Sequence, residues 1–457
     1  MTPAFAIVGH PNKGKSSIVA TLAQDDSVAV SAQSGTTTVA ETLQVEVGRS
    51  KFTLIDTPGF QRPRRVLQWL QQHAETAEQR QAAVERFVND AECWQQFPDE
   101  VELLRPIVDG AVILYVVDGS RPYGAEYEAE MEILRWTGQA SMALINPIEN
   151  EQYINSWQQA LSQYFKVVRV FNAIQADFDK QMSILEAFSH LREDWKDQIS
   201  DLIAEYRHLR DEQRHQTLQL LVELLSDICS FQVSQKVLSR EQARKLQPVL
   251  EKRFYSALAR RERQAHDALK DLYHYHNLAI KSSELPTEEN LFDTEKWIIW
   301  GLNRRQLLIA ATMAGAATGA VVDLGLAGHS LFLGALTGGL IAGGSAWFGA
   351  DRLADFKVRG LPMGGYEARQ GPMKNRNFPY VVLNRFLFLY DALQQRTHAR
   401  RDSLRIEEGD LSDRIEQLDS AGQKQLHRQL EKLSQQQVTD SLELALTPLL
   451  ESALSLK

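Results

Sequence analysis

The pattern Gly-x-x-x-x-Gly-Lys-Ser/Thr appears near the start of the chain as Gly9-His10-Pro11-Asn12-Lys13-Gly14-Lys15-Ser16, followed by Ser17. In this pattern the glycines let backbone N–H groups face phosphate oxygens, the lysine reaches the β- and γ-phosphates, and the hydroxyl ligates Mg²⁺. An apolar run precedes the pattern and a helical pattern follows it, so a positive helix N-terminus would face the same anion. We therefore predict that residues 9–17 bind nucleotide phosphates, with Lys15 as a catalytic cation and Ser16 as a Mg²⁺ ligand.

A second motif, Asp56-Thr57-Pro58-Gly59, follows an apolar run that ends at Ile55. A carboxylate at the end of a strand can hold Mg²⁺ through water, and the Gly59 N–H can contact the γ-phosphate and so sense its presence. We predict that Asp56 is a metal residue and Gly59 a catalytic one. The alternative is a plain turn that closes a strand.

Three threonines lie between these motifs, in Ser34-Gly35-Thr36-Thr37-Thr38. The hydroxyl of one of them could ligate Mg²⁺ while its backbone contacts the γ-phosphate. The residues alone leave open which threonine does so, and a polar loop without ligands is the alternative.

Apolar runs and helical patterns alternate over the first third of the chain. The expected strands are residues 4–8, 43–47 and 51–55 as a hairpin, 111–117, 142–145 and 167–171. Strands that alternate with helices indicate a doubly wound α/β sheet. We predict an α/β phosphate-loop domain with a mixed sheet over residues 1–178.

The composition changes near residue 180. From there to about residue 300 apolar residues recur at helical spacing, as at Leu218, Leu221, Leu225 and Ile228. We predict a helical domain over 179–300 and a C-terminal helical region over 360–457, so the rest of the chain is mainly α-helical.

Between these helical regions, residues 307–350 are almost entirely small or apolar, with Asp323 and His329 as the ionisable residues. Two spans joined by a turn at 323–330 would form a glycine-rich membrane hairpin within 301–359. Lysine and arginine flank both ends of the segment and are missing from the turn, which places both ends in the cytoplasm. The location would be the cytoplasmic side of the inner membrane, or the cytoplasm if the hairpin is buried in a soluble fold.

Charge and cysteine content narrow the class of protein. The formal net charge is −9, so no nucleic-acid partner is expected. The two cysteines, Cys93 and Cys229, lie far apart, which fits a reducing compartment rather than a disulfide framework.

The three motifs together resemble the TrmE–Era branch of small bacterial GTPases, which has G-x-P-N-x-G-K-S, G-T-T and D-T-x-G signatures. The resemblance implies binding of GTP and GDP, Thr37 as the catalytic threonine and Mg²⁺ ligand, and Asn12 as a K⁺ ligand. Asn12 has capping of the loop as its alternative role. The Arg-Asp that usually follows the threonines is replaced by Thr38-Val39.

Ras-like enzymes carry a catalytic glutamine directly after the glycine of the second motif, where this chain has Phe60. The resemblance therefore implies slow hydrolysis, raised by K⁺, by dimerisation or by a partner. Gln61 is the neighbouring residue and is not assigned the catalytic role.

Guanine is usually selected by N-K-x-D after a buried strand, and this chain has Asn146-Pro147-Ile148-Glu149 at that place. Asn146 is kept, and Glu149 can still accept hydrogen bonds from guanine. Asn172 and Ala173 stand where the family has its S-A-K loop. GTP is the favoured nucleotide, with ATP or low selectivity and a non-hydrolysing site as alternatives.

The whole chain also resembles a bacterial family of predicted GTPases that carry a C-terminal domain of unknown function. Residues 115–124 belong to this resemblance, and the turn at 118–124 either lines the site or only joins a strand to a helix. We expect a slow, membrane-associated GTPase switch that forms a homodimer or binds a membrane protein. The alternative is a structural membrane adaptor that binds nucleotide and barely hydrolyses it.

Overall fold

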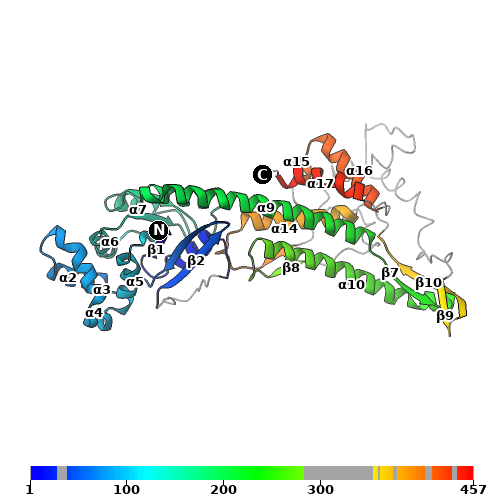
Figure 1. Cartoon of the computed structure of the whole chain (residues 1–457), viewed down its shortest axis with the longest axis horizontal. Coiled ribbons are helices and arrows are strands. Elements are labelled where there is room, and N and C mark those ends of the chain that lie inside the picture. The colour runs from blue at the N-terminus through cyan, green and yellow to red at the C-terminus, as the bar shows by residue number, and fades with distance from the viewer. Residues whose placement is uncertain are drawn as a thin grey trace. The chain divides into compact units, whose positions relative to one another are not determined.

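The computed structural model describes residues 2–27, 39–282, 354–358, 361–373, 378–406, 414–434 and 440–455 (Figure 1). Backbone contacts divide the chain into two compact units. The first unit comprises Met1–Gln213, Lys270–Ala279 and Ala392–Ser403, and the second comprises Arg214–Leu269, Ile280–Asp391 and Leu404–Lys457.

A six-stranded sheet forms the centre of the first unit, with strand order β2-β3-β1-β4-β5-β6. Its strands are β1 (Ala4–Val8), β2 (Glu41–Val47), β3 (Ser50–Asp56), β4 (Val112–Asp118), β5 (Ser141–Asn146) and β6 (Val167–Val170). The β2–β3 hairpin is antiparallel and every other pairing is parallel. This mixed, mostly parallel α/β sheet confirms the predicted fold class of the N-terminal part.

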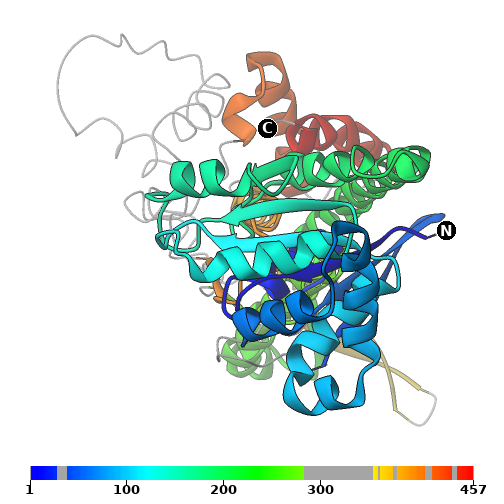
Figure 2. The same ribbon diagram turned by 90° about the vertical axis from the view of Figure 1, so that its left-hand side faces the viewer.

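Helices cover both faces of this sheet (Figure 2). They are α1 (Lys15–Ala23), α2 (Pro63–Gln72), α3 (Arg80–Asn89), α4 (Ala91–Gln96), α5 (Pro98–Val108), α6 (Glu126–Trp136), α7 (Ile154–Leu161) and α8 (Phe178–Ser189), with 3₁₀ turns at Ala77–Gln79 and Glu193–Trp195. Alternate residues of β1 point into different cores: Ala6 packs with α2–α7, whereas Phe5 packs with α1 and α8. Burial on both faces explains why the central strands β1, β4 and β5 read as continuous apolar runs.

Two long helices, α9 (Lys196–Ser230) and α10 (Arg240–Leu272), follow the sheet. The start of α9 belongs to the first unit, where Tyr206 is buried and donates a hydrogen bond to the Leu22 carbonyl at 3.0 Å. Later segments complete this unit: the His398 ring stacks on Tyr275 at 4.2 Å and lies 2.9 Å from the Tyr273 carbonyl through Nε2.

The buried His398 should make the stability of the first unit depend on pH. Burial lowers the pKa of His398 to about 4, from 6.5 for the free side chain. Between pH 6.5 and pH 4 the imidazole is protonated in the unfolded chain but stays neutral in the folded chain. The contribution of His398 to stability is therefore fully present above pH 6.5 and is lost as the pH falls toward 4. The loss should approach about 3 kcal/mol near pH 4.

Chemical denaturation at a series of pH values between 4 and 6.5 measures this loss. In His398→Gln the free energy of unfolding should fall less steeply with decreasing pH than in the wild type. His208→Gln, which changes an exposed histidine of α9, is the matched control and should keep the wild-type slope. An unchanged slope in His398→Gln would contradict this assignment.

The second unit is mainly helical but contains two small sheets. Its helices are α14 (Phe378–Gln395), α15 (Arg414–Gln417), α16 (Ser420–Ser434) and α17 (Asp440–Ser455), besides parts of α9 and α10. Strands β7 (Val233–Val237), β10 (Leu361–Gln370) and β9 (Ala354–Val358) form an antiparallel sheet in that order, and β8 (Ile280–Ser282) pairs with β11 (Leu404–Ile406) in parallel. The helical character was predicted, whereas these strands were not. β7 and β8 pair with β10 and β11 across more than a hundred residues, whereas β9 pairs with β10, the next strand along the chain.

The apolar residues that predicted a helix at 218–228 are all buried in α9. A buried ion pair joins α10 to α14, where Arg385 Nε lies 2.6 Å from Glu262 Oε1 and Arg385 Nη2 lies 3.2 Å from Glu262 Oε2. The C-terminal helices pack through Leu426, Leu430 and Leu450.

The predicted glycine-rich hairpin, residues 307–350, lies outside the described residues. In the described part of the chain, none of the helices combines the length and the apolar character that a membrane span requires.

Candidate nucleotide-binding site

The phosphate loop joins β1 to α1 and depends on two glycines. Gly9 and Gly14 have φ values of 146° and 82°, in the left-handed region that favours glycine. A Cβ at Gly9 would stand 2.3 Å from the Val116 carbonyl oxygen, and one at Gly14 would stand 2.3 Å from Asn146 Nδ2. The loop therefore lies directly against β4 and the end of β5, and substitution at either glycine would displace it.

Lys15 is the first residue of α1 and is buried within this loop. Its Nζ donates hydrogen bonds to the carbonyls of Gly9 at 3.4 Å and His10 at 3.3 Å. Burial lowers the pKa of Lys15, while the nearby carboxylates of Asp56 and Glu130 oppose that shift. These long bonds to neutral carbonyls leave the ammonium weakly compensated, so a phosphate would be a better partner.

Ser16 and Asp56 meet where a metal ligand set is expected. Ser16 Oγ donates to Asp56 Oδ2 at 2.5 Å, whereas Asp56 Oδ1 is buried and has no hydrogen-bond partner among the described residues. Burial raises the pKa of Asp56, and the Ser16 hydrogen bond and Lys15 act in the opposite direction. An orphaned carboxylate oxygen beside a hydroxyl fits oxygen coordination of Mg²⁺. The third predicted ligand, Thr37, lies outside the described residues.

The segment after Asp56 is anchored by its main chain. Thr57 Oγ1 donates to the Ile7 carbonyl at 2.8 Å, and Gly59 approaches Pro11 so closely that a Cβ would stand 2.6 Å from the Pro11 nitrogen. The Phe60 side chain is fully buried in the core, and the Gln61 N–H donates to Glu100 Oε1 at 2.9 Å. Phe60 is therefore part of the core, and the main chain at Gln61 is held by α5.

Glu100 was not predicted from the sequence. It is buried on α5 and also accepts a hydrogen bond from the Arg62 N–H at 2.5 Å. Glu100 lies among the buried apolar residues of α5. A charged residue at such a position in the sequence could have indicated a buried hydrogen-bond acceptor.

Asn146 connects three parts of the site. Its Nδ2 donates to the Lys13 carbonyl at 3.1 Å, and its Oδ1 accepts from the Ala173 N–H at 3.3 Å. Asn172 Nδ2 donates to the Pro147 carbonyl at 3.0 Å. The structure thus brings the phosphate loop, the Asn146–Glu149 segment and the Asn172–Ala173 loop together, as the predicted base site requires.

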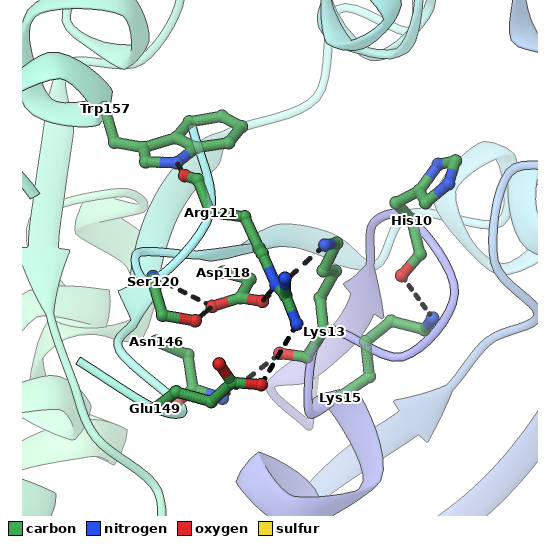
Figure 3. A network of polar contacts seen from close by, with 9 residues as sticks. All are labelled: His10, Lys13, Lys15, Asp118, Ser120, Arg121, Asn146, Glu149 and Trp157. Carbon is green, nitrogen blue, oxygen red and sulfur yellow. Dashed lines mark hydrogen bonds and ion pairs between the residues drawn. The ribbon is translucent and has the colours of Figure 1, made fainter. Parts of the chain in front are cut away.

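A chain of charges runs along this side of the site (Figure 3). Lys13 Nζ lies 3.7 Å from Asp118 Oδ2, Arg121 Nε lies 3.9 Å from the same oxygen, and Arg121 Nη2 lies 3.0 Å from Glu149 Oε1. Asp118 Oδ1 accepts from the N–H and hydroxyl of Ser120 at 2.9 and 2.5 Å. The turn at 118–124 therefore contacts both the phosphate loop and Glu149, and Arg121 is a residue that the sequence prediction did not single out.

His10 belongs to the phosphate loop, but its ring is directed away from the Lys15 ammonium (Figure 3). His10 Nδ1 lies 2.9 Å from Glu130 Oε1, and Tyr115 OH donates to Glu130 Oε2 at 2.9 Å. Burial raises the pKa of Glu130, while its hydrogen bond with His10 opposes the shift. In this arrangement the His10 carbonyl, rather than the ring, accepts a hydrogen bond from Lys15.

Two family models match the chain. The model of the 50S ribosome-binding GTPase matches residues 4–146. The model of the domain of unknown function DUF3482 matches residues 158–448, well over half of the chain. The chain belongs to the DUF3482 family. Its N-terminal part is a TrmE–Era-like P-loop GTPase domain, as the motifs predicted, and this member of the family carries that domain ahead of the DUF3482 region.

Curated relatives resemble the GTPase part. The chain is 42% identical over 141 residues to GTPase Der of Symbiobacterium thermophilum, which covers 31% of the chain and 25% of Der. It is 29% identical over 144 residues to GTPase Der of Azoarcus sp., covering 32% of the chain and 27% of Der. The chain thus spans about a quarter of the length of these relatives.

Two solved structures also resemble the chain at low sequence identity. Era in complex with MgGDPNP and nucleotides 1506–1542 of 16S ribosomal RNA is 14% identical, with a TM-score of 0.28, over 60% of this chain and 90% of Era. The LeoA bacterial dynamin GTPase is 12% identical, with a TM-score of 0.24, over 99% of this chain and 90% of LeoA.

Proposed function

We propose that this DUF3482-family protein is a GTPase switch that binds GTP with Mg²⁺ and hydrolyses it slowly. The observation that carries the proposal is the convergence of Lys15, Ser16 and Asp56, in which a buried ammonium, a hydroxyl and a carboxylate with one unpartnered oxygen adjoin the phosphate loop. This arrangement fits a nucleoside triphosphate and its divalent cation.

The residues divide the chemistry between them. Lys15 and the backbone N–H groups of residues 9–17 hold the β- and γ-phosphates, and Gly59 reports whether the γ-phosphate is present. Ser16, Asp56 and Thr37 would hold Mg²⁺, which neutralises charge on the phosphates when it is bound. A water attacks the γ-phosphate and is positioned by the segments at Thr37 and Gly59.

We propose slow hydrolysis because the position of the Ras-like glutamine is occupied by the buried Phe60. Potassium at Asn12, dimerisation or a partner would supply the missing charge or positioning. Asn12 has a φ of 61°, which places it in the left-handed region within the loop. The runner-up is a nucleotide-binding adaptor that barely hydrolyses GTP, and the same buried phenylalanine supports it.

Phosphate release by the purified full-length chain tests the proposal. We expect slow GTP hydrolysis in NaCl and a rate at least severalfold higher in KCl, because a bound K⁺ would act where other GTPases use an arginine. NaCl and KCl at equal ionic strength are the matched conditions. Release that is not raised by K⁺ but is raised by a partner would remove the role of Asn12. No release under any of these conditions, with GTP still bound, would favour the adaptor.

We also propose that residues 307–350 associate with the cytoplasmic side of the inner membrane. The protein would form a homodimer or bind a membrane protein. Its domains would meet at residues 178, 300 and 359. The composition of 307–350 supports a bilayer hairpin. Flotation with vesicles of neutral lipid tests it, and a protein that never floats would contradict it.

A further inference from the structure

A pocket of about 830 Å³ in the second unit combines residues of α10 with Asp227 of α9, Phe231 and Val233 of β7. Four cationic side chains line it: Lys252, Arg253, Arg260 and Arg261. Positions 253, 256, 260 and 264 of α10 are three or four residues apart and so share one helical face. A neighbouring face of α10 is buried through Leu250, Phe254 and Leu258.

The charge of this helix is opposite to that of the chain. The chain has a formal net charge of −9, whereas α10 carries nine Lys and Arg against five Asp and Glu. Two of those carboxylates are already paired, Glu262 with Arg385 of α14 and Glu241 with Lys245 of α10 itself. Four of the nine cations of α10 line the pocket, and among the described residues the only carboxylate in its lining is Asp227.

The cations of the pocket are unequally engaged. Arg261 Nε lies 2.7 Å from Asp227 Oδ2. Arg261 thereby neutralises Asp227, the carboxylate that lines the pocket. Arg253 contacts Gln235 Oε1 at 3.5 Å, and Lys252 and Arg260 have no ion-pair partner among the described residues. Three exposed cations thus face the same space without a carboxylate between them.

The floor of the pocket is apolar. Val249 is 44% exposed and lines it together with Val233 and Phe231. The Arg261 guanidinium covers the Phe231 ring at 3.7 Å from its centroid, and this ring also stacks on Phe254 at 5.8 Å. Because Arg261 and Phe254 already contact the Phe231 ring, this ring is not free to stack on a base of single-stranded RNA. A cationic rim over an apolar floor better suits a phosphate attached to an apolar or neutral group.

We propose that this pocket of the DUF3482 region binds a phosphate ester, supplied either as the head group of an acidic phospholipid or as a soluble molecule. The phosphate would contact Lys252, Arg253 and Arg260, and the attached group would lie on Val249 and Val233. This inference does not rest on GTP hydrolysis, since every residue that it uses lies in the second unit.

Replacing the three cations tests the proposal in the full-length chain. Lys252, Arg253 and Arg260 are changed together to glutamine, and the control changes Arg244, Lys245 and Arg263, which are exposed on the same helix but do not line the pocket. The probes are phosphatidylcholine vesicles with and without phosphatidylglycerol, glycerol 3-phosphate in calorimetry, and an RNA hairpin. Binding to neutral vesicles measures the membrane affinity that does not depend on an acidic head group, such as that proposed for residues 307–350.

We expect the gain in affinity from phosphatidylglycerol to fall about a hundredfold in the pocket variant, because each cation near an acidic surface contributes about fivefold. The control variant should lose much less. Glycerol 3-phosphate binding that disappears in the pocket variant alone would assign the site to a soluble ester. Equal losses in the two variants, pocket-dependent binding of RNA without binding of either phosphate ester, or no binding of any probe would overturn the proposal.

Discussion

Lys15→Ala is expected to weaken GDP binding by about a thousandfold, the largest effect that the structure implies. Among the described residues the ammonium donates to the carbonyls of Gly9 and His10, at 3.4 and 3.3 Å, and each charge-assisted bond to phosphate is worth about 1.5–3 kcal/mol. Equilibrium titration with a fluorescent GDP measures the loss. Lys51→Ala is the control, since Lys51 is an exposed lysine on β3 of the same domain, and it should bind GDP as the wild type does.

The stability of the same variant separates binding from misfolding. Burial lowers the pKa of Lys15, which means that the nucleotide-free loop holds a charge at a cost. Removing the ammonium should therefore leave the melting temperature of the free protein unchanged or raise it. Binding that survives in Lys15→Ala, with a folded protein, would place the phosphates somewhere other than residues 9–17.

Features encoded within a few consecutive residues were predictable from the sequence. The phosphate loop, the strands of the sheet and α1 follow from one local pattern each, because strand and helix periodicities are read over short windows. The place where Asn146 connects the loop to Ala173 was also predictable, since parallel strands bring their carboxyl ends to one edge of the sheet.

Contacts between distant residues were not predictable in the same way. The His10–Glu130 contact joins residues 120 apart, and β7 pairs with β10 across more than a hundred residues. Arg121 and Glu149 meet only because β4 and β5 are neighbours in the sheet and each is followed by a turn at the same edge. Local periodicity contains no information on such pairings, so the partners of the titratable groups appear only in the fold.

Glu149→Gln is expected to weaken GDP binding by about ten- to a hundredfold and to improve binding of xanthosine diphosphate. A carboxylate accepts from both N1–H and the amino group of guanine, whereas the amide keeps one acceptor and adds an N–H that suits the C2 carbonyl of xanthine. Titration with GDP, xanthosine diphosphate and ADP measures the three affinities. Glu132→Gln is the matched control, because Glu132 pairs with Arg135 at 2.6 Å in the same domain, outside the predicted base site. Equal GDP affinity in the two variants would show that Glu149 does not read the base.

Arg121→Ala tests whether Arg121 takes the place of the usual lysine in selecting guanine. Pro147 occupies the lysine position, and Arg121, held through its carbonyl by the Trp157 indole N–H at 2.8 Å, places its guanidinium 3.0 Å from Glu149. If this pair orients the carboxylate, Arg121→Ala should lower the preference for GDP over ADP by about threefold to tenfold, as expected for the loss of an exposed ion pair and of a cation–π contact with the base. If Arg121 instead competes with guanine for Glu149, the same variant should bind GDP more tightly. The sign of the change therefore decides whether the arginine replaces the lysine or restrains the site.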